Sequence, residues 1–429
     1  MSEAGLEQKY IKEAFDTNWV VPLGPNVNGF EKDLEEFVGE GKRVVALSSG
    51  TAAVHLGLLA AGVGPGDEVL VQSFTFCAST HPITYLGAMP ILIDSEPDTW
   101  NIDPDLMEEA IKDRIAKTGK KPKAIVPVAL YGMPYKADRI MEIANKYDIP
   151  VVEDAAEGFG SKYKGQILGT FGKYGVLSFN GNKMITTSGG GALITANDDE
   201  WREIMMYATQ YRESYPYYQH EKIGYNYRMS NICAGIGRGQ MTIVDEHLKH
   251  HKYVQWLYEE LLDNVEGITV HSQPDTGEYD SNYWLCTITL DPNLRIKGQE
   301  NAYKTMVTGA VGGAAGVIHM AESATTDCQP NDNVEALRVL MDKANIEARP
   351  VWKPMHKQPV YLRTNDNSKL IIDNLPCGAV CQTSDESVAY INGVSEGLFK
   401  VGMCLPAGPY VTEEDVRYIV DTIKEAIVG

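Results

Sequence analysis

The sequence predicts an α/β fold built on a mostly parallel sheet. Between residues 43 and 195, short β-branched apolar runs alternate with stretches that have helical spacing. Nearly continuous apolar runs are typical of strands that helices cover on both faces. Seven strands with helical connections make a large α/β layer. The seven runs are 43–47, 68–74, 90–94, 123–128, 150–154, 175–179 and 190–195.

Three of the intervening segments carry clear helix signals. Residues 51–62 are rich in Ala and Leu and follow Ser-Ser-Gly. Asp103 and Pro104 supply an N-cap residue and a proline at the first helical position. Residues 137–146 repeat apolar side chains at helical spacing. These segments provide the helices that the alternation of strands and helices requires.

The pattern changes near residue 250, which predicts a large domain over 1–250 and a smaller α+β domain over 251–429. Residues 198–250 have helical spacing at both ends of a Tyr-rich loop. A Gly/Ala-rich insertion near 303–333 interrupts the second domain, and its glycines lack the spacing of a phosphate loop. The other elements predicted there are a helix over 251–264, a hairpin from 267–272 and 283–290, and a capped amphipathic helix over 412–427.

Composition limits the classes of partner. The 429 residues include 38 Lys and Arg against 58 Asp and Glu, so the net charge is 38 − 58 = −20. Such an acidic chain argues against nucleic acid or an anionic membrane as the main partner. No export signal or spanning segment is recognised, so we expect a cytoplasmic protein. The seven cysteines are scattered, only Cys377 and Cys381 being close, and are expected to be reduced rather than zinc-bound.

Polar residues follow several of the predicted strands, where open α/β sheets bind their ligands. The segment Ser48–Thr51 lies between a strand and a helix, and free N–H groups at a helix start bind anions. An ordinary helix cap has the same composition, so this segment alone leaves both interpretations open. Asp154 ends the strand 150–154, where its carboxylate could hold a protonated ring nitrogen or cap the next turn.

Lys183 lies in a Gly/Asn turn after a strand and before a run of glycines. Most lysines are simply solvated, but a lysine held in a cleft can condense with a carbonyl group. Ser178, just upstream, has a hydroxyl that can donate to a phosphate. Seven tyrosines between 207 and 227 suit a subunit interface, a ligand groove, or a loop held by its own aromatic rings.

Together these features fit pyridoxal phosphate. This cofactor needs an anion-binding site, a carboxylate at its ring nitrogen and a lysine at its aldehyde. The order Gly50-Thr51, Asp154, Lys183 supplies all three, with 183 − 154 = 29 residues between the last two.

The chain resembles the nucleotide-sugar aminotransferases of the DegT/StrS type, which are fold-type I pyridoxal phosphate enzymes. The match runs from about Val20 to the C-terminus, and the Gly/Ala-rich insertion lies outside the common pattern. The motifs that carry it are VPLGPNV (21–27), LSSGTAAVHL (47–56), SFTFCAS (73–79), LYGMP (130–134), VVEDAAEGFGS (151–161), LSFNGNK (177–183), GYNYRMS (224–230), RPVWKPMH (349–356) and LPAG (405–408).

The resemblance implies a fold-type I transferase, with a mostly parallel seven-stranded sheet domain and a smaller C-terminal α+β domain. It also implies a role for each matching residue. Lys183 would bond to the cofactor aldehyde and carry the catalytic proton. The cofactor would be held by Asp154 at the ring nitrogen, Phe76 on the ring face, Glu157 near the phenolic oxygen or the substrate, Gly50, Thr51 and Ser178 at the phosphate, and Asn226 of a neighbouring subunit. The last assignment implies a homodimer with shared active sites.

Departures from the common pattern indicate a substrate. Glu157 stands where many members carry Gln or His, and Ser188–Gly191 stands where many carry Gly-Glu-Gly-Gly. Both resemble the branch that aminates UDP-linked 2-acetamido-4-keto-6-deoxyhexoses at C4 for bacterial surface polysaccharide or glycan biosynthesis. L-Glutamate would donate the amino group and leave as 2-oxoglutarate, with pyridoxamine phosphate as the intermediate form. A third departure is Ala129, where many members carry His.

Two alternatives remain at this point, a 3-keto sugar nucleotide aminotransferase and a non-catalytic regulatory protein of the same fold. The segment with Arg349, Trp352, Lys353 and His356 offers cations and a flat ring to a diphosphate and a uracil, or forms a structural turn. Arg228, from the partner subunit, is a similar candidate.

Overall fold

The structure is a computed structural model that describes residues 5–303, 328–361 and 389–428. The insertion predicted near 303–333 falls largely on residues 304–327. The pair Cys377 and Cys381 falls on residues 362–388, so both predictions lie outside the described residues. Within the described ranges, no helix combines the length and the apolar character needed to cross a membrane.

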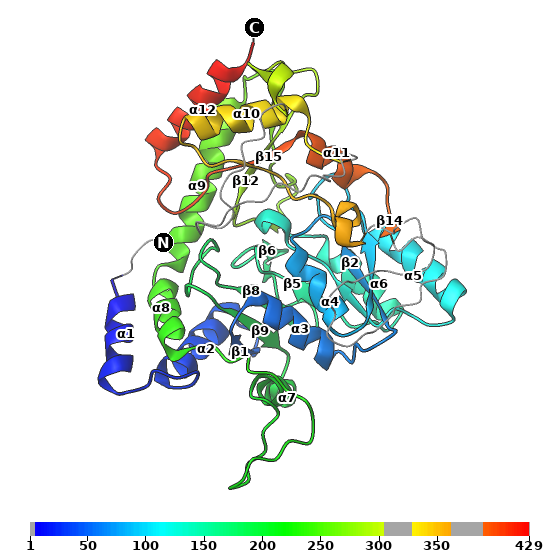
Figure 1. Ribbon diagram of the computed structural model, residues 1–429, viewed down its shortest axis with the longest axis vertical. Coiled ribbons are helices and arrows are strands. Elements are labelled where there is room, and N and C mark those ends of the chain that lie inside the picture. The colour runs from blue at the N-terminus through cyan, green and yellow to red at the C-terminus, as the bar shows by residue number, and fades with distance from the viewer. Residues whose placement is uncertain (1–4, 304–327, 362–388, 429) are drawn as a thin grey trace.

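A mostly parallel sheet forms the lower part of the molecule (Figure 1). All seven predicted strands are present, in the order β3-β2-β4-β5-β8-β9-β1. Parallel bridges Ile125–Val151 and Val128–Asp154 join its two halves between β4 and β5. Among these described strands, β9 alone runs antiparallel. The strands are β1 Arg43–Leu47, β2 Glu68–Gln72, β3 Met89–Ile93, β4 Ala124–Val126, β5 Val152–Asp154, β8 Tyr174–Ser178 and β9 Gly191–Thr195.

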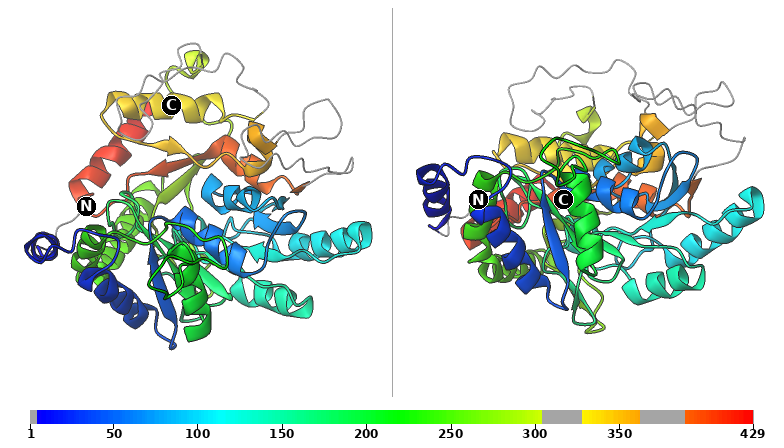
Figure 2. Two further views of the ribbon diagram at one scale, coloured as in Figure 1. Left: turned by 60° about the horizontal axis from the view of Figure 1, so that its bottom comes forward. Right: turned by 90° about the horizontal axis from the view of Figure 1, so that it is seen from below.

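Helices cover both faces of this sheet (Figure 2). Side chains of a strand alternate between faces, so Val44 and Ala46 of β1 join one hydrophobic cluster while Val45 and Leu47 join the other. The first cluster contains side chains of α2, α5 and α6, and the second contains those of α3, α4 and α7. The helices of this part are α1 Glu7–Asp16, α2 Pro25–Val38, α3 Gly50–Ala60, α4 His81–Tyr85, α5 Pro104–Thr118, α6 Ala137–Lys146, α7 Asp198–Ala208 and α8 Asn231–Met241.

The helix signals in the sequence are confirmed. Asp103 caps α5 by accepting hydrogen bonds from the backbone N–H groups of Asp105 and Leu106, at 2.9 and 3.2 Å. Helices α3 and α6 begin and end within two residues of the predicted bounds. The loop between α7 and α8 contains the Tyr-rich segment, as the pattern predicted.

An antiparallel sheet of order β10-β12-β15-β13 lies in the upper part, with its own hydrophobic cluster. The predicted hairpin is confirmed as the antiparallel pair β10 and β12, and Thr412 with Asp415 forms a capping box at α12. The elements are α9 Val244–Leu262, α10 Asp332–Lys343, α11 Val394–Val401, α12 Glu413–Ala426, β10 Ile268–Val270, β12 Cys286–Leu290, β13 Arg349–Pro350 and β15 Gly402–Leu405, with a small sheet of β6 Lys162–Tyr163, β7 Gln166–Ile167 and β11 Tyr279–Asp280.

Helix α9 differs from its prediction. The helix expected to begin at residue 251 begins at Val244 and continues to Leu262. It therefore passes residue 250 without a break, running from the lower to the upper part of the molecule (Figure 1). The division into domains at 250/251 stays a prediction.

The C-terminal segment returns to the large sheet, which the sequence pattern did not indicate. Strand β14, Ala389–Tyr390, pairs in parallel with β3 as an eighth strand. The buried carboxylate of Asp94 then accepts hydrogen bonds from the backbone N–H groups of Asn392, Gly393 and Ser395. A two-residue strand has too little periodicity to predict, and its place is fixed by this carboxylate.

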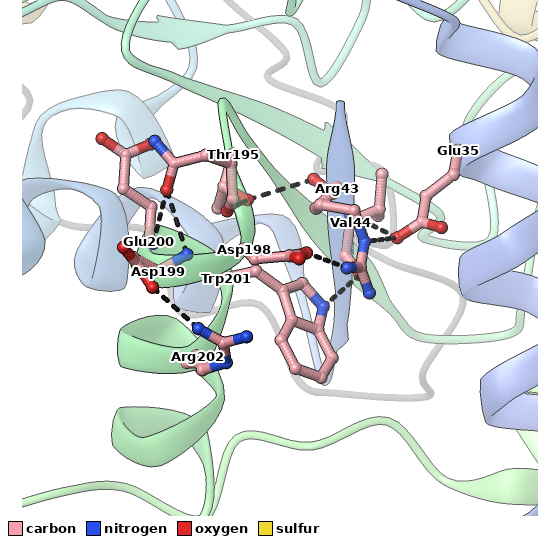
Figure 3. A network of polar contacts seen from close by, with 10 residues as sticks. Glu35, Arg43, Val44, Thr195, Asp198, Asp199, Glu200, Trp201 and Arg202 are labelled. Atoms are coloured by element: carbon pink, nitrogen blue, oxygen red, sulfur yellow. Dashed lines mark hydrogen bonds and ion pairs between the residues drawn. The ribbon is translucent and has the colours of Figure 1, made fainter. Parts of the chain in front are cut away.

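At the opposite edge, polar contacts join β1 to its neighbours (Figure 3). The Arg43 guanidinium donates to Glu35 of α2 at 2.8 Å and to Asp198 at the start of α7. Its carbon centre lies 4.7 Å from the Trp201 ring, whose Nε1–H donates to the Val44 carbonyl at 3.1 Å. One side chain thus links two helices across the last strand of the sheet.

A buried carboxyl in β5 predicts a pH-dependent stability. Glu153 is fully buried and accepts a hydrogen bond from the Tyr135 hydroxyl at 2.6 Å. Burial raises the pKa of Glu153 from 4.5 to about 7, although this hydrogen bond lowers it. The native state therefore holds a proton that the unfolded chain releases near pH 4.5. Binding this proton in the native state adds to the free energy of unfolding. The added stability is complete below pH 4.5 and is lost as the pH rises through 7.

Glu153→Gln cannot titrate, so its stability relative to wild type should rise between pH 4.5 and 7, by about 1.4 kcal/mol per pH unit. Urea unfolding of both proteins at several pH values measures this difference. Tyr135→Phe removes the hydrogen bond that lowers the pKa of Glu153 in the folded state, so it should extend the upper end of the window to higher pH. A difference between the proteins that stays constant from pH 4.5 to 8 would contradict the assignment.

Candidate active site

The candidate site lies at one edge of the large sheet, where several chain segments converge. The parallel strands end there, and antiparallel β9 begins there, so the residues after β1, β2, β5 and β8 meet those before β9. They surround a cavity of about 390 Å³. Seven of the predicted site residues line it: Gly50, Thr51, Phe76, Asp154, Glu157, Ser178 and Lys183. The roles predicted for these residues stay predictions, but the tertiary structure brings them together.

One end of the cavity is formed by the start of α3. Ser49 caps this helix by accepting a hydrogen bond from the Ala52 N–H at 3.0 Å. A Cβ atom added to Gly50 would lie 2.9 Å from the Cβ of Ser178, and one added to Gly191 would lie 2.3 Å from the Ser49 carbonyl carbon. The glycines thus let backbone and hydroxyl groups converge at a helix N-terminus, which suits a phosphate.

Asp154 is buried at the base of the cavity. Its carboxylate accepts hydrogen bonds from the Ser79 hydroxyl at 2.6 Å and the Ala156 N–H at 3.1 Å. Burial raises the pKa of Asp154, and these two donors and the charge of Lys183 only partly offset that effect. A cationic ring nitrogen beside this carboxylate would supply the positive charge that keeps it ionised.

Lys183 points its amine into the cavity between an acid and an aromatic ring. The Nζ atom lies 3.5 Å from Glu157 Oε1 and 4.0 Å from the centre of the Trp284 ring. The ring is fixed by its Nε1–H, which donates to the Asn182 carbonyl at 2.7 Å. Only 13% of the Lys183 side chain is exposed. The amine is thus held at the cavity wall rather than in bulk solvent.

Glu157 and Asp154 both lie close enough to Lys183 for its charge to lower their pKa values. The other oxygen of Glu157 accepts a hydrogen bond from the Tyr131 N–H at 2.8 Å. Burial raises the pKa of Glu157, the Lys183 charge and the Tyr131 N–H lower it, and the Asp154 charge raises it again. The cavity therefore contains two buried carboxyl groups and one ammonium group.

A second cavity of about 1270 Å³ adjoins the first and shares Phe76, Asn182, Trp284 and Trp352 with it. Arg349 and Tyr410 also line the larger space. Its walls thus carry several aromatic rings and the Arg349–Glu347 ion pair, whose atoms lie 2.8 Å apart.

Two sequence candidates for diphosphate contacts have other partners in this chain. Arg228 donates to Glu31 at 2.5 Å and to the Ala46 carbonyl at 2.9 Å, with 8% of its side chain exposed. His356 contacts Ser73 at 2.7 Å and Glu396 at 3.1 Å. Both are occupied within the fold, so the prediction that they meet a diphosphate is not supported.

Comparison with known proteins decides the family. The family model described as "DegT/DnrJ/EryC1/StrS aminotransferase family" matches residues 2–312. The EpsN protein of Bacillus subtilis, whose name places it among pyridoxal phosphate-dependent aminotransferases, is 40% identical over 98% of this chain and 92% of its own length. GDP-perosamine synthase of Caulobacter vibrioides is 33% identical over 99% of this chain and 96% of its own length.

The chain belongs to the DegT/DnrJ/EryC1/StrS aminotransferase family. A crystal structure of a family aminotransferase from Brucella abortus superposes with a TM-score of 0.77, covering 98% of this chain and 95% of that one, at 24% identity. At that identity, the likeness shows the fold alone. The fold-type I architecture expected from the sequence is thereby confirmed.

Pyridoxal phosphate is the cofactor of this family. The residues present fit it, because the helix start with Gly50 and Ser178 leaves the space that a phosphate needs. Asp154 is a buried acid short of positive charge, and the Lys183 amine shares its cavity. Asn226 is exposed and lies outside the cavity lining of this single chain, so its predicted role is not tested here.

The structure adds site residues that the sequence analysis did not single out. Ser79 donates to Asp154, and Trp284 covers the Lys183 amine. Ser79 belongs to the recognised motif SFTFCAS. The motif therefore identified this segment but did not predict the hydrogen bond from Ser79 to Asp154. Trp284 comes from the β11–β12 connection, 101 positions after Lys183 by 284 − 183, and no local pattern relates the two.

Lys183→Ala should fold normally but lose amino transfer. Removing the amine leaves Glu157 without its cation, and this buried group then takes up a proton instead of unfolding the chain. Loss of a positioned proton carrier typically lowers the rate by about 10²–10⁴-fold. Single-turnover amino transfer and the thermal unfolding midpoint measure the two effects. Lys173→Ala, at an exposed lysine 3.9 Å from Glu200, is the matched control and should retain activity. Near-normal turnover by Lys183→Ala would exclude Lys183 as the proton carrier.

Proposed function

We propose that this protein transfers an amino group from L-glutamate to the C4 keto carbon of a UDP-linked 2-acetamido-4-keto-6-deoxyhexose. At the coarser level it is a sugar aminotransferase of its family, which acts on nucleotide sugars with an amino donor. The observation that carries the proposal is the Lys183 amine in one cavity with Asp154 and the start of α3.

Each residue then has a physical task. When bound, pyridoxal phosphate supplies an electron sink for the carbanion formed at the reacting carbon. Asp154 holds a negative charge where the ring nitrogen would carry a positive one. The Lys183 amine would act first as a base and then as an acid. It would take one proton from the reacting carbon and return it to a carbon of the cofactor. Gly50, Thr51 and Ser178 would hold the phosphate, and Phe76 would lie against the ring.

Water exclusion is the second requirement, because a reactive carbanion must not be protonated at random. Trp284 covers the Lys183 amine, and Trp352 lies 5.8 Å from Phe76, between ring centres, at the opening toward the second cavity. These rings replace water on the open side of the site. Glu157 Oε1 lies 3.5 Å from the amine, so it is a nearby acceptor that can orient Lys183 toward the cavity.

The sugar nucleotide would extend into the second cavity, where Arg349, Tyr410 and Trp352 supply a cation and aromatic faces. The assignment of UDP and a 4-keto group is supported by the sequence of the segment around Lys183. The similarity to GDP-perosamine synthase favours a second candidate, a GDP-linked substrate.

A substrate panel tests the proposal. Purified protein reconstituted with pyridoxal phosphate is given L-glutamate and UDP-, GDP- or dTDP-linked 4-keto-6-deoxy sugars, with a UDP-linked 3-keto sugar as a further arm. The UDP-2-acetamido-4-keto sugar should have the highest kcat/KM, by at least about tenfold, which corresponds to about 1.4 kcal/mol of discrimination. NMR ring couplings of the product locate the new amine.

Each other outcome of the panel has a defined meaning. A higher kcat/KM for the GDP sugar would favour the second candidate, and amination at C3 would favour the 3-keto alternative. A colourless protein that does not bind pyridoxal phosphate, and aminates no substrate, would support a non-catalytic regulatory role.

We also propose that the enzyme is a homodimer in which the partner's chain supplies Asn226 to the phosphate. In the same loop between α7 and α8, Tyr217 and Tyr218 have 63% and 78% of their surface exposed in one chain, which suits burial against a second subunit. Because Lys183 and Asn226 of one site would come from different chains, two inactive variants should complement each other.

Mixing Lys183→Ala with Asn226→Ala under conditions that exchange subunits should restore about a quarter of wild-type activity, since random pairing makes half of the dimers mixed, each with one intact site. Steady-state activity before and after exchange measures this gain. Each variant mixed with itself is the control and should remain inactive. Absence of any gain, with exchange verified by tagged subunits, would place both residues in the same chain's site.

A further inference from the structure

Three residues from distant parts of the chain form a hydrogen-bonded series next to the active site. Ser73 follows β2, His356 follows Trp352 by four positions, and Glu396 lies in the first turn of α11. The Ser73 Oγ lies 2.7 Å from His356 Nδ1, and His356 Nε2 lies 3.1 Å from Glu396 Oε1. The series therefore joins the large sheet to the segment that follows β13 of the upper sheet and to α11.

The donors and acceptors of this series are mutually consistent. A carboxylate only accepts, so the His356 Nε2 carries the hydrogen toward Glu396. The backbone N–H of His356 donates to the Ser73 Oγ at 3.2 Å, which leaves the hydroxyl hydrogen free for Nδ1. Burial lowers the pKa of His356, although Glu396 and the charge of Asp94 raise it, and Lys357 lowers it further. One neutral tautomer thus satisfies all three groups.

Serine, histidine and an acid in this order also occur in hydrolases, but burial excludes that chemistry. The Ser73 side chain is fully buried, and the His356 side chain is 7% exposed. Within the described residues, none of the three lines the active-site cavity. A nucleophile must reach its substrate, so this series can only hold atoms in place.

The series is connected to residues that do line the cavity. Three positions after Ser73 comes Phe76, and the same segment ends at Ser79, which bonds to Asp154. Thr75 lies 2.8 Å from Ser79 between their hydroxyl oxygens. The segment 73–79 is therefore fixed at Ser79 by Asp154 and at Ser73 by His356.

The other connection runs to Trp352. Its backbone N–H donates to the Tyr131 hydroxyl at 2.7 Å, and the Met355 N–H donates to the Ser73 carbonyl at 2.8 Å. The ring centres of Phe76 and Trp352 are 5.8 Å apart. The two aromatic walls of the cavity thus belong to two segments that meet at Ser73 and His356.

We propose that Ser73, His356 and Glu396 are positioning residues that fix Phe76 and Trp352 at the cofactor cavity. Glu396 sets the His356 tautomer, and His356 in turn holds Ser73. The proposal concerns the cofactor end of the site, so it rests on the family's cofactor and not on the identity of the sugar nucleotide.

Two substitutions of one residue separate the two halves of the series. His356→Asn keeps an acceptor near the place of Nδ1 for Ser73, and His356→Gln keeps a donor near the place of Nε2 for Glu396. Hydrogen exchange of the backbone over 73–79 and visible circular dichroism of bound pyridoxal phosphate are measured on the holoenzyme without sugar. Ser73→Ala and His356→Gln should speed exchange there about tenfold, the effect of losing one buried hydrogen bond on local opening. Both variants should also weaken the visible circular dichroism at unchanged cofactor content. His356→Asn should have a smaller effect on the exchange rate and on the dichroism.

Lys357→Ala is the matched control. It removes the second partner of Glu396 Oε1, at 3.1 Å, but leaves the contacts among Ser73, His356 and Glu396 in place, so exchange at 73–79 should be unchanged. The proposal is overturned if Ser73→Ala lowers only the unfolding midpoint while exchange and dichroism match wild type. It is equally overturned if His356→Asn and His356→Gln have equal effects. If the His356 variants do not fold, Ser73→Ala alone decides. No sugar is present in these measurements, so a failure of the substrate panel leaves their outcome intact.

Discussion

The chemistry of this protein depends on an imbalance of buried charge. Two carboxyl groups, Asp154 and Glu157, share the single ammonium group of Lys183 inside one cavity. Isolated buried carboxylates are costly, and the chain offsets that cost only partly with hydrogen bonds from Ser79 and from backbone N–H groups. A cofactor with a cationic ring nitrogen would complete the arrangement, because it would supply the positive charge that Asp154 lacks.

The sheet determines where this imbalance is located. Parallel strands place their carboxyl ends on one edge, and the antiparallel β9 returns the chain so that its first residues reach the same edge. Because Gly50 and Gly191 have no side chains, Gly50 lies close to Ser178 and Gly191 lies close to the backbone of Ser49. A Cβ atom at either glycine would prevent this approach. The shape of the cavity at the start of α3 is thus a consequence of strand order and of the absence of side chains at these glycines.

The other wall of the site includes Trp352, which lies 352 − 76 = 276 positions after Phe76. Strand β14 and α11 are fixed to the large sheet by Asp94, and the Ser73–His356–Glu396 series joins the same returning segment to the loop with Phe76. The upper part of the molecule is therefore connected to the cofactor cavity through buried polar bonds. Buried polar bonds are directional, so they fix the place of an aromatic wall more narrowly than apolar packing does.

The sequence by itself determined the strands, because their apolar runs are β-branched, nearly continuous and separated by helical patterns, and all seven appear with their helices. It also indicated the family's cofactor, since Lys183, Asp154 and the Gly50 segment belong to ordered motifs. Only the tertiary structure decided which of the other candidates reach the cavity. Arg228 and His356 have the right chemistry for a diphosphate, yet Glu31, Ser73 and Glu396 occupy them. Trp284 reaches Lys183 from another element, and β14 pairs with β3, because such contacts depend on how distant segments pack and leave no periodicity in the chain.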